Sequence, residues 1–351
     1  MWFAPLFDAK NVSLSFIPVI LPWGAYRRRA ETMPVDITHF PQVRRLFRSF
    51  SQSWLMESLG VRLRRRMIAQ VMRECCHDDG ACALFREVEI ETVNRCNGSC
   101  SFCPVNASSD PRPMATMTDE LFERIIRELS ALQYDGLIGL SSNNEPFIDK
   151  KIISRIHLCR SACPKARLYL YTNGTLINGE TVLDAIRAGL DKMVIDDYSD
   201  DLVLSAHARS IVETLNRPEN DWAALKVEVV IRKRNEVLRN RAGRAPNKSC
   251  ATNRVFKLYA DMGCTKPFKQ LVIRPTGQVS LCCNDTLGEV TLGDVSRDGL
   301  LGVWNGDEYQ SVRSQLLSAG RRGLPLCASC DTPCYGVLDV ARFSCSSSRR
   351  R

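Results

Sequence analysis

The chain has 351 residues, a net charge of +9 and 16 cysteines. This length suits one large domain and a smaller one, and its excess of basic residues lies near the two ends, without a basic stripe mixed with aromatic side chains. We therefore expect no nucleic-acid partner. The apolar run 12–23 is broken by two prolines, is too short to span a bilayer and precedes its arginines. We expect no secretion signal, no membrane anchor and a cytoplasmic location, where cysteines favour metal binding over disulfides.

Residues 1–80 carry no motif with recognisable chemistry, and we interpret them as a basic N-terminal extension with one amphipathic helix between 47 and 75. From 84 to about 250, strands alternate with helices, which is typical of parallel strands joined by right-handed crossovers. Five strands and room for a sixth indicate a partial α/β barrel, because a full eight-fold barrel takes about 250 residues. The expected strands are 84–93, 136–141, 167–171, 192–196 and 225–232, and the expected helices are 118–132, 149–162, 179–188 and 200–216.

Three cysteines follow the first expected strand with the spacing Cys-x3-Cys-x2-Cys, namely Cys96, Cys100 and Cys103. Iron–sulfur clusters usually take four thiolates, so three from one loop leave a distant fourth ligand or one iron with an open position. The carboxyl ends of barrel strands are also where α/β barrels keep their active sites. Zinc is the alternative occupant, but zinc sites of this kind usually pair two Cys-x2-Cys arms.

The loop resembles the signature of the radical S-adenosylmethionine (SAM) superfamily, in which an aromatic residue, here Phe102, precedes the third cysteine. The resemblance implies a partial (β/α)6 barrel and a [4Fe–4S] cluster held by the three cysteines and by SAM. It also implies that an electron from the cluster cleaves SAM to methionine and a 5′-deoxyadenosyl radical. A reductant such as flavodoxin or ferredoxin is the implied electron donor.

Two later turns match further sites of this family. The family's Gly-Gly-Glu-Pro, which holds the amino group of SAM, is replaced here by Asn143, Asn144, Glu145 and Pro146. Asparagine tolerates unusual backbone angles, so the resemblance still places the SAM amino group at this turn. Asn173, in a Thr-Asn-Gly turn after the third strand, and Phe102 of the cysteine loop are the other cofactor-binding residues that the resemblance implies. Taken alone, each of the two turns is an ordinary one.

Polar residues at the ends of the fourth and fifth strands are candidates for catalysis. Asp196, Asp197 and Tyr198 end the fourth strand, where they could orient ribose hydroxyls or a polar substrate, or only cap a loop. Arg232 ends the fifth strand, where it could clamp a carboxylate or phosphate or only face solvent.

A second group of cysteines follows in residues 255–340, around an expected hairpin at 270–283. The segment resembles the small α+β domain called SPASM, or its shorter form, twitch, which binds auxiliary [4Fe–4S] clusters. The resemblance implies four ligands for one auxiliary cluster, with Cys283 and Cys334 as substitutes or as ligands of a second cluster; zinc is again the alternative. We expect residues 341–351 to form a disordered basic tail. The four implied ligands are Cys264, Cys282, Cys327 and Cys330.

The resemblance implies a radical SAM oxidoreductase that removes hydrogen from a substrate carbon and oxidises it with help from the auxiliary cluster. Aminocyclitol alcohol dehydrogenases and maturases of peptides or sulfatases share this architecture. Because no peptide-recognition domain is recognisable at the amino end, we expect a small polar metabolite, with a peptide or protein substrate as the alternative. A non-catalytic iron–sulfur or zinc-binding regulator is the alternative from another class, and the intact cysteine loop and Glu145 speak against it.

Overall fold

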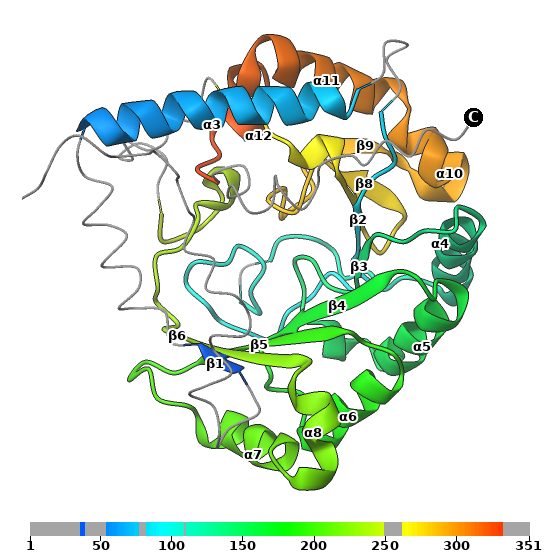
Figure 1. Cartoon of the computed structure of the whole chain (residues 1–351), viewed down its shortest axis with the longest axis vertical. Coiled ribbons are helices and arrows are strands. Elements are labelled where there is room, and N and C mark those ends of the chain that lie inside the picture. The colour runs from blue at the N-terminus through cyan, green and yellow to red at the C-terminus, as the bar shows by residue number, and fades with distance from the viewer. Residues whose placement is uncertain (1–35, 39–53, 77–81, 109, 249–261, 333–351) are drawn as a thin grey trace, which may run out of the picture. The chain divides into compact units, whose positions relative to one another are not determined.

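The computed structural model describes residues 36–38, 54–76, 82–108, 110–248 and 262–332, all within one compact unit, Val35–Arg351. Its nine strands form one sheet in the order β1-β6-β5-β4-β3-β2-β7-β8-β9 (Figure 1). The strands are β1 (Asp36–Thr38), β2 (Glu87–Ile90), β3 (Leu137–Gly139), β4 (Arg167–Thr172), β5 (Lys192–Tyr198), β6 (Val227–Arg232), β7 (Gln270–Ile273), β8 (Gln278–Ser280) and β9 (Thr291–Asp294).

The seven strands from β1 to β7 pair in parallel, and β8 and β9 pair antiparallel at one edge. The five expected strands β2 to β6 are all present, and helices connect them, so the prediction of a partial α/β barrel is confirmed. Two further parallel strands flank these five: β1, which lies upstream of the cysteine loop, and β7, which follows β6 in sequence. Because parallel strands share one direction, the loops that follow β2 to β6 meet at the same edge of the sheet.

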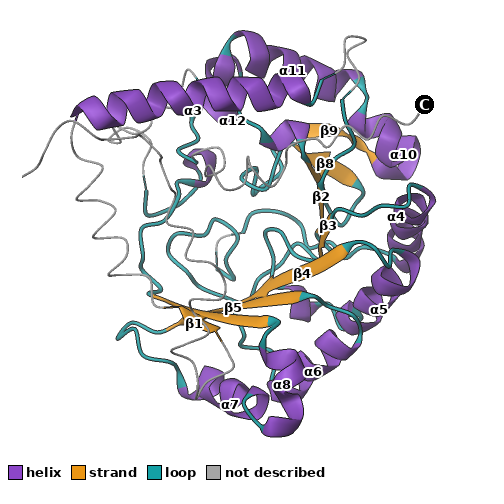
Figure 2. Cartoon of the chain, viewed as in Figure 1, coloured by secondary structure: helices purple, strands orange, loops and turns teal. Residues whose placement is uncertain are grey.

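The connecting helices lie along the outer side of the parallel strands (Figure 2). Helix α4 shows why they form there: the Thr118 side chain caps its first turn, and Phe122, Ile125 and Leu129 share a core with Val88 of β2. One side of β2 is therefore apolar and faces the helices. The helices are α4 (Asp119–Ala131), α5 (Ile152–Ala162), α6 (Gly179–Arg187), α7 (Ala206–Leu215) and α8 (Asp221–Ala224).

The described parts of the first 80 residues, 36–38 and 54–76, pack against the rest of the unit. Strand β1 pairs with β6, and the expected amphipathic helix is present as α3 (Trp54–Glu74), which contacts α11 (Asp307–Ser318) (Figure 1). Ile68 and Met72 of α3 are each 2% exposed. Helices α3 and α11, which are far apart in sequence, therefore pack together.

The expected C-terminal hairpin is present as β7 and β8, with Gly277 at φ +92° in its turn. Its place in the sheet was not expected, because β7 pairs in parallel with β2 and thereby attaches the second cysteine segment to the first barrel strand. Helices α10 (Val295–Trp304), α11 and α12 (Pro325–Ala328) follow. Residues 333–351, with Cys334 and the expected tail, lie outside the described residues. In the part of the chain that the structure describes, no helix is long and apolar enough to cross a membrane.

Candidate active site and cysteine sites

The cysteine loop leaves the carboxyl end of β2 and is fixed at its base by Asn94, whose amide donates to the carbonyl of Pro113 at 2.8 Å. The loop then turns at Gly98. A Cβ atom at that position would lie 3.4 Å from the sulfur of Cys96 and 3.9 Å from the sulfur of Cys100. Glycine therefore leaves room beside two of the three sulfurs.

Cys96, Cys100 and Cys103 line one cavity of about 190 Å³. Burial raises the pKa of the Cys96 thiol to about 11 and also raises the pKa of Cys100. Such thiols keep their protons at neutral pH until a bound cation displaces them. Within the described ranges, no three His, Cys, Asp or Glu side chains are placed to hold a single metal ion. Soft thiols spread around a cavity fit the span of an iron–sulfur cluster.

Glu145 lies in the wall of the same cavity, and its side chain is already held by three donors of the chain. The carboxylate accepts hydrogen bonds from the Thr172 hydroxyl at 2.8 Å, from the Asn173 N–H at 2.8 Å and from the Phe147 N–H at 3.1 Å. The N–H of Glu145 donates to the carbonyl of Arg95 at 2.8 Å. Glu145 thus joins the loop after β3 to the loop after β4 and to the cysteine loop, while its contact with the amino group of SAM stays a prediction.

Changing Glu145 to glutamine is expected to weaken SAM binding about tenfold or more and to lower the free energy of unfolding by about 1–3 kcal/mol. The reason is that a glutamine side chain has one acceptor oxygen, so at least one of the buried donors loses its partner. Equilibrium SAM binding and urea unfolding measure the two effects, and iron content is expected to stay unchanged. Glu123→Gln, at a half-exposed position of α4, is the matched control. Wild-type values for both quantities in Glu145→Gln would contradict this role.

Phe102 and Asn173, the other residues predicted to bind the cofactor, lie beside the cysteine loop. The Asn173 side-chain amide lies 3.7 Å from the Cys96 sulfur and donates to the side-chain oxygen of Asn97 at 2.8 Å. The Phe102 ring is 4% exposed and its centroid lies 6.0 Å from that of Tyr198. Both residues line the 190 Å³ cavity, so the structure brings them together with the three cysteines.

The two asparagines that replace the family's glycines differ in their contacts. The side-chain oxygen of Asn144 accepts from the N–H of Ser142 at 2.9 Å and shapes its own turn. The side-chain amide of Asn143 donates to the carbonyl of Cys283 at 3.1 Å. Asn143 therefore links the turn predicted to bind SAM with the second cysteine segment, a contact that a glycine cannot make.

Three of the four predicted catalytic candidates meet at the cavity. Asp196 and Tyr198 line it, and the Arg232 side chain donates to the Asp196 carboxylate at 2.7 Å. Burial raises the pKa of Asp196, although the charge of Arg232 opposes this. Asp197 faces the other side of β5, because successive strand residues point in opposite directions, and its carboxylate accepts from the N–H of Ser205 at 2.8 Å. Asp197 thus caps the loop that leads into α7.

A polar cluster that was not predicted lies inside the barrel around Glu89 of β2. The Glu89 carboxylate accepts from the Ser142 hydroxyl at 2.6 Å and from the Gln270 amide at 2.9 Å. The same amide donates to Glu87 at 2.9 Å, and the Tyr169 hydroxyl donates to Glu87 at 2.7 Å. Burial, followed by the charge of Glu87, raises the pKa of Glu89 to about 7. The signal was present in the sequence, because glutamates at alternate positions of one strand share a face.

The four C-terminal cysteines implied as ligands also line one small cavity, in which burial raises the pKa values of Cys282 and Cys327. The charge of Cys264 adds to the shift of Cys327 and, after that of Cys283, to the shift of Cys282. Cys283 does not line this cavity, and the charge of Lys266 opposes the rise in its pKa that burial causes. The cavity-lining cysteines are Cys264, Cys282, Cys327 and Cys330.

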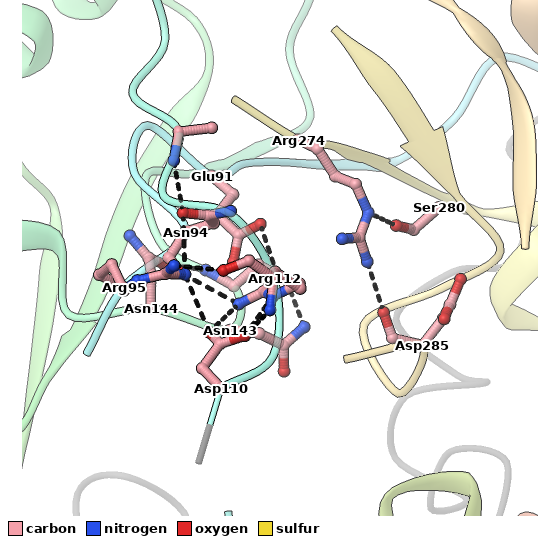
Figure 3. Close-up of polar contacts among 12 residues, drawn as sticks. Glu91, Asn94, Arg95, Asp110, Arg112, Asn143, Asn144, Arg274, Ser280 and Asp285 are labelled. Carbon is pink, nitrogen blue, oxygen red and sulfur yellow. Dashed lines mark hydrogen bonds and ion pairs between the residues drawn. The ribbon is translucent and has the colours of Figure 1, made fainter. Parts of the chain in front are cut away.

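A group of charged side chains holds the segment after the cysteine loop against β2 (Figure 3). Arg112 donates twice to the Asp110 carboxylate, at 3.0 and 2.9 Å, and lies 3.7 Å from the Glu91 carboxylate. Arg95 adds a second cation 3.3 Å from Asp110. Arg274, in the turn of the C-terminal hairpin, lies apart from this group and donates to the carbonyl of Asp285 at 2.8 Å. The group fixes both ends of the loop that carries the three cysteines.

Comparison with known proteins agrees with this geometry. Residues 90–201 match the radical SAM superfamily, and residues 264–331 match SPASM, described as an iron–sulfur cluster-binding domain. The S-adenosyl-L-methionine-dependent 2-deoxy-scyllo-inosamine dehydrogenase of Niallia circulans is 25% identical over 250 residues, which cover 71% of this chain and 93% of that protein.

Two solved structures share the fold. The crystal structure of BtrN in complex with AdoMet and 2-DOIA superposes with a TM-score of 0.60 and 23% identity. The match covers 71% of this chain and 94% of the BtrN chain. An open conformation of BtrN has a TM-score of 0.52 and 20% identity over the same shares of the two chains. With the cysteine cavities and the matched segments, the conclusion is that this chain belongs to the radical SAM superfamily, with SAM and [4Fe–4S] clusters as its cofactors and a C-terminal SPASM domain.

Proposed function

We propose that this radical SAM enzyme oxidises a hydroxyl-bearing carbon of a small polar metabolite, an aminocyclitol or a sugar, to a carbonyl. The observation that carries the proposal is the cavity beside the three cysteines, whose wall combines the Asp196 carboxylate with the hydroxyls of Ser142, Tyr171 and Tyr198. Such groups suit the hydroxyl and ammonium groups of a polyol. The dehydrogenase from Niallia circulans, which is named for the aminocyclitol 2-deoxy-scyllo-inosamine, supports the same class.

When bound, SAM and its cluster supply the radical that takes a hydrogen atom from the substrate carbon, and the auxiliary cluster supplies an acceptor for one electron. A hydroxyl proton must leave as well before the carbonyl can form. Ser142 lines the cavity and its hydroxyl donates to Glu89 at 2.6 Å. A substrate hydroxyl that donates to Ser142 can therefore pass its proton on as Ser142 gives its own to Glu89. We assign Glu89 as the proton acceptor that acts through Ser142.

The test is anaerobic incubation of the reconstituted enzyme with SAM, dithionite and 2-deoxy-scyllo-inosamine carrying deuterium on its carbinol carbons. Dithionite replaces the natural reductant, for which we propose a flavodoxin or ferredoxin. The expected results are a probe-dependent rise in 5′-deoxyadenosine, transfer of deuterium into it, and a ketone product. If neither this probe nor related aminocyclitols and sugars stimulate 5′-deoxyadenosine formation, the metabolite assignment is wrong. Stimulation by a peptide alone would instead support a maturase, and a loaded protein that never cleaves SAM would support a regulator.

The oxidation rate is expected to rise as the pH increases through about 7, because Glu89 can accept a proton only when it is ionised. Burial and the charge of Glu87 raise the pKa of Glu89, whereas Lys266, the hydrogen bond from Ser142 and Arg241 lower it. Single-turnover rates between about pH 5.5 and 8.5 give the profile. Glu89→Gln should remove the inflection and slow oxidation about 100-fold or more, and Glu123→Gln should keep the wild-type profile. An unchanged inflection in Glu89→Gln would assign it to another group.

A further inference from the structure

Two cationic side chains, Arg321 and Lys266, line the cavity of the four C-terminal cysteines. Arg321 lies in the turn Gly320–Gly323 and is 2% exposed, a position in which arginine is rarely found unless it is paired or hydrogen-bonded. Its neighbour Arg322 is exposed. The chain therefore places one arginine of a consecutive pair against the cysteines and the other in solvent.

The contacts of Arg321 reach two of the segments that carry the cysteines. Its Nη1 donates to the carbonyl of Cys330 at 3.2 Å, and its Nε donates to the carbonyl of Gly263, the residue before Cys264, at 3.4 Å. These contacts place the guanidinium against the cavity that the four cysteines line. The charge of Arg321 accordingly acts on Cys327, where it opposes the rise in thiol pKa that burial causes.

Lys266 brings a second positive charge from another direction. It follows Cys264 by two residues, its Nζ lies 3.3 Å from the side-chain oxygen of Gln270, and its charge acts on Cys282 as that of Arg321 acts on Cys327. One acid acts against these cations: the charge of Asp285, which follows β8, raises the pKa of Cys327. Its carboxylate already accepts from the N–H groups of Glu289 and Val290, at 2.8 and 3.1 Å.

We propose that Arg321 and Lys266 raise the reduction potential of the auxiliary [4Fe–4S] cluster and thereby suit it to accept the electron of the substrate. A four-cysteine cluster gains one negative charge on reduction, so a fixed cation nearby stabilises the reduced form more than the oxidised form. In this step the substrate radical loses one electron, the cluster gains that electron, and the hydroxyl proton leaves through Ser142. The inference rests on the iron–sulfur occupant of this cavity and not on the identity of the substrate.

The experiment is a redox titration of the reconstituted full-length enzyme, followed by electron paramagnetic resonance and without substrate. Repeating it in the Cys96→Ala, Cys100→Ala, Cys103→Ala triple variant leaves the auxiliary cluster as the observed signal. Arg321→Gln is expected to lower the reduced-to-oxidised ratio at fixed potential about tenfold or more, which is a shift of about 59 mV for one electron. Arg321→Lys should keep most of the wild-type potential, because it keeps the charge, and Arg322→Gln should not change it.

Lys266→Met tests the same charge effect at a second site, and it is expected to lower the potential in the same direction. Iron analysis shows that each variant still holds the cluster. The proposal is overturned if Lys266→Met and Arg321→Gln both keep the wild-type potential, if Arg321→Lys shifts it as far as Arg321→Gln, or if the cavity takes zinc. If Arg321→Gln loses its iron, the potential of Lys266→Met decides. Because no substrate is present, a wrong substrate assignment leaves every one of these outcomes unchanged.

Discussion

Replacing Cys96, Cys100 and Cys103 together by alanine is expected to remove about four iron atoms per chain and to abolish the formation of 5′-deoxyadenosine from SAM. The three thiols line one cavity with Glu145 and Asn173, and no other cysteine among the described residues lines that cavity. Without the cluster, no electron reaches the sulfonium of SAM, and the carbon–sulfur bond stays intact. Iron analysis and chromatography of 5′-deoxyadenosine after reduction with dithionite measure the two losses.

The matched control is Cys163→Ala, because this thiol is 2% exposed at the end of α5 and lines neither cysteine cavity. It should keep the wild-type iron content and the wild-type rate of SAM cleavage. Circular dichroism distinguishes loss of the cluster from loss of the fold. A folded triple variant that still cleaves SAM would refute the assignment of the cysteine loop, whatever its iron content.

The spacing of the cysteines and the alternation of strands and helices were sufficient to predict the barrel and the position of the cysteine loop after its first strand. Both signals are local, because one loop carries Cys96, Cys100 and Cys103 and because the alternating strands and helices are neighbours in the sequence. The contribution of the terminal segments could not be predicted in the same way. The pairings of β1 with β6 and of β7 with β2 join distant segments, and no periodicity in the sequence specifies such partners.

The polar face of β2 shows a second reason for an incomplete prediction. Alternation indicates that Glu87 and Glu89 share one face and Val88 the other, but a polar strand face usually meets solvent in a small protein. Here the apolar face packs against helices and the polar face lines the barrel, so Glu89 is 8% exposed. The same alternation separates Asp196, at the cavity, from Asp197, at the start of α7. Periodicity thus gives the two faces of a strand, and the tertiary structure decides which face carries chemistry.

Changing Cys327 and Cys330 together to alanine is expected to abolish the oxidised product while SAM cleavage continues without it. The two residues line the same cavity as Cys264 and Cys282, which lies apart from the cavity of the SAM cluster. Loss of two of four thiolates should remove about four iron atoms per chain. The substrate radical then has no acceptor for its electron, so the carbonyl cannot form, whereas the SAM cluster still receives electrons from the external reductant.

The ratio of oxidised product to 5′-deoxyadenosine is the measurement, because it separates an acceptor from a part needed for SAM cleavage. Wild-type enzyme should give a ratio near one, and the double variant a ratio near zero with 5′-deoxyadenosine still formed. Metal binding can contribute to folding, so the ratio is taken on the soluble, monodisperse fraction, which excludes unfolded chains from the comparison. Cys163→Ala should again match the wild type. A folded double variant with a normal product ratio would show that the auxiliary cluster does not take the electron, and an equal loss of both products would show that it serves SAM cleavage itself.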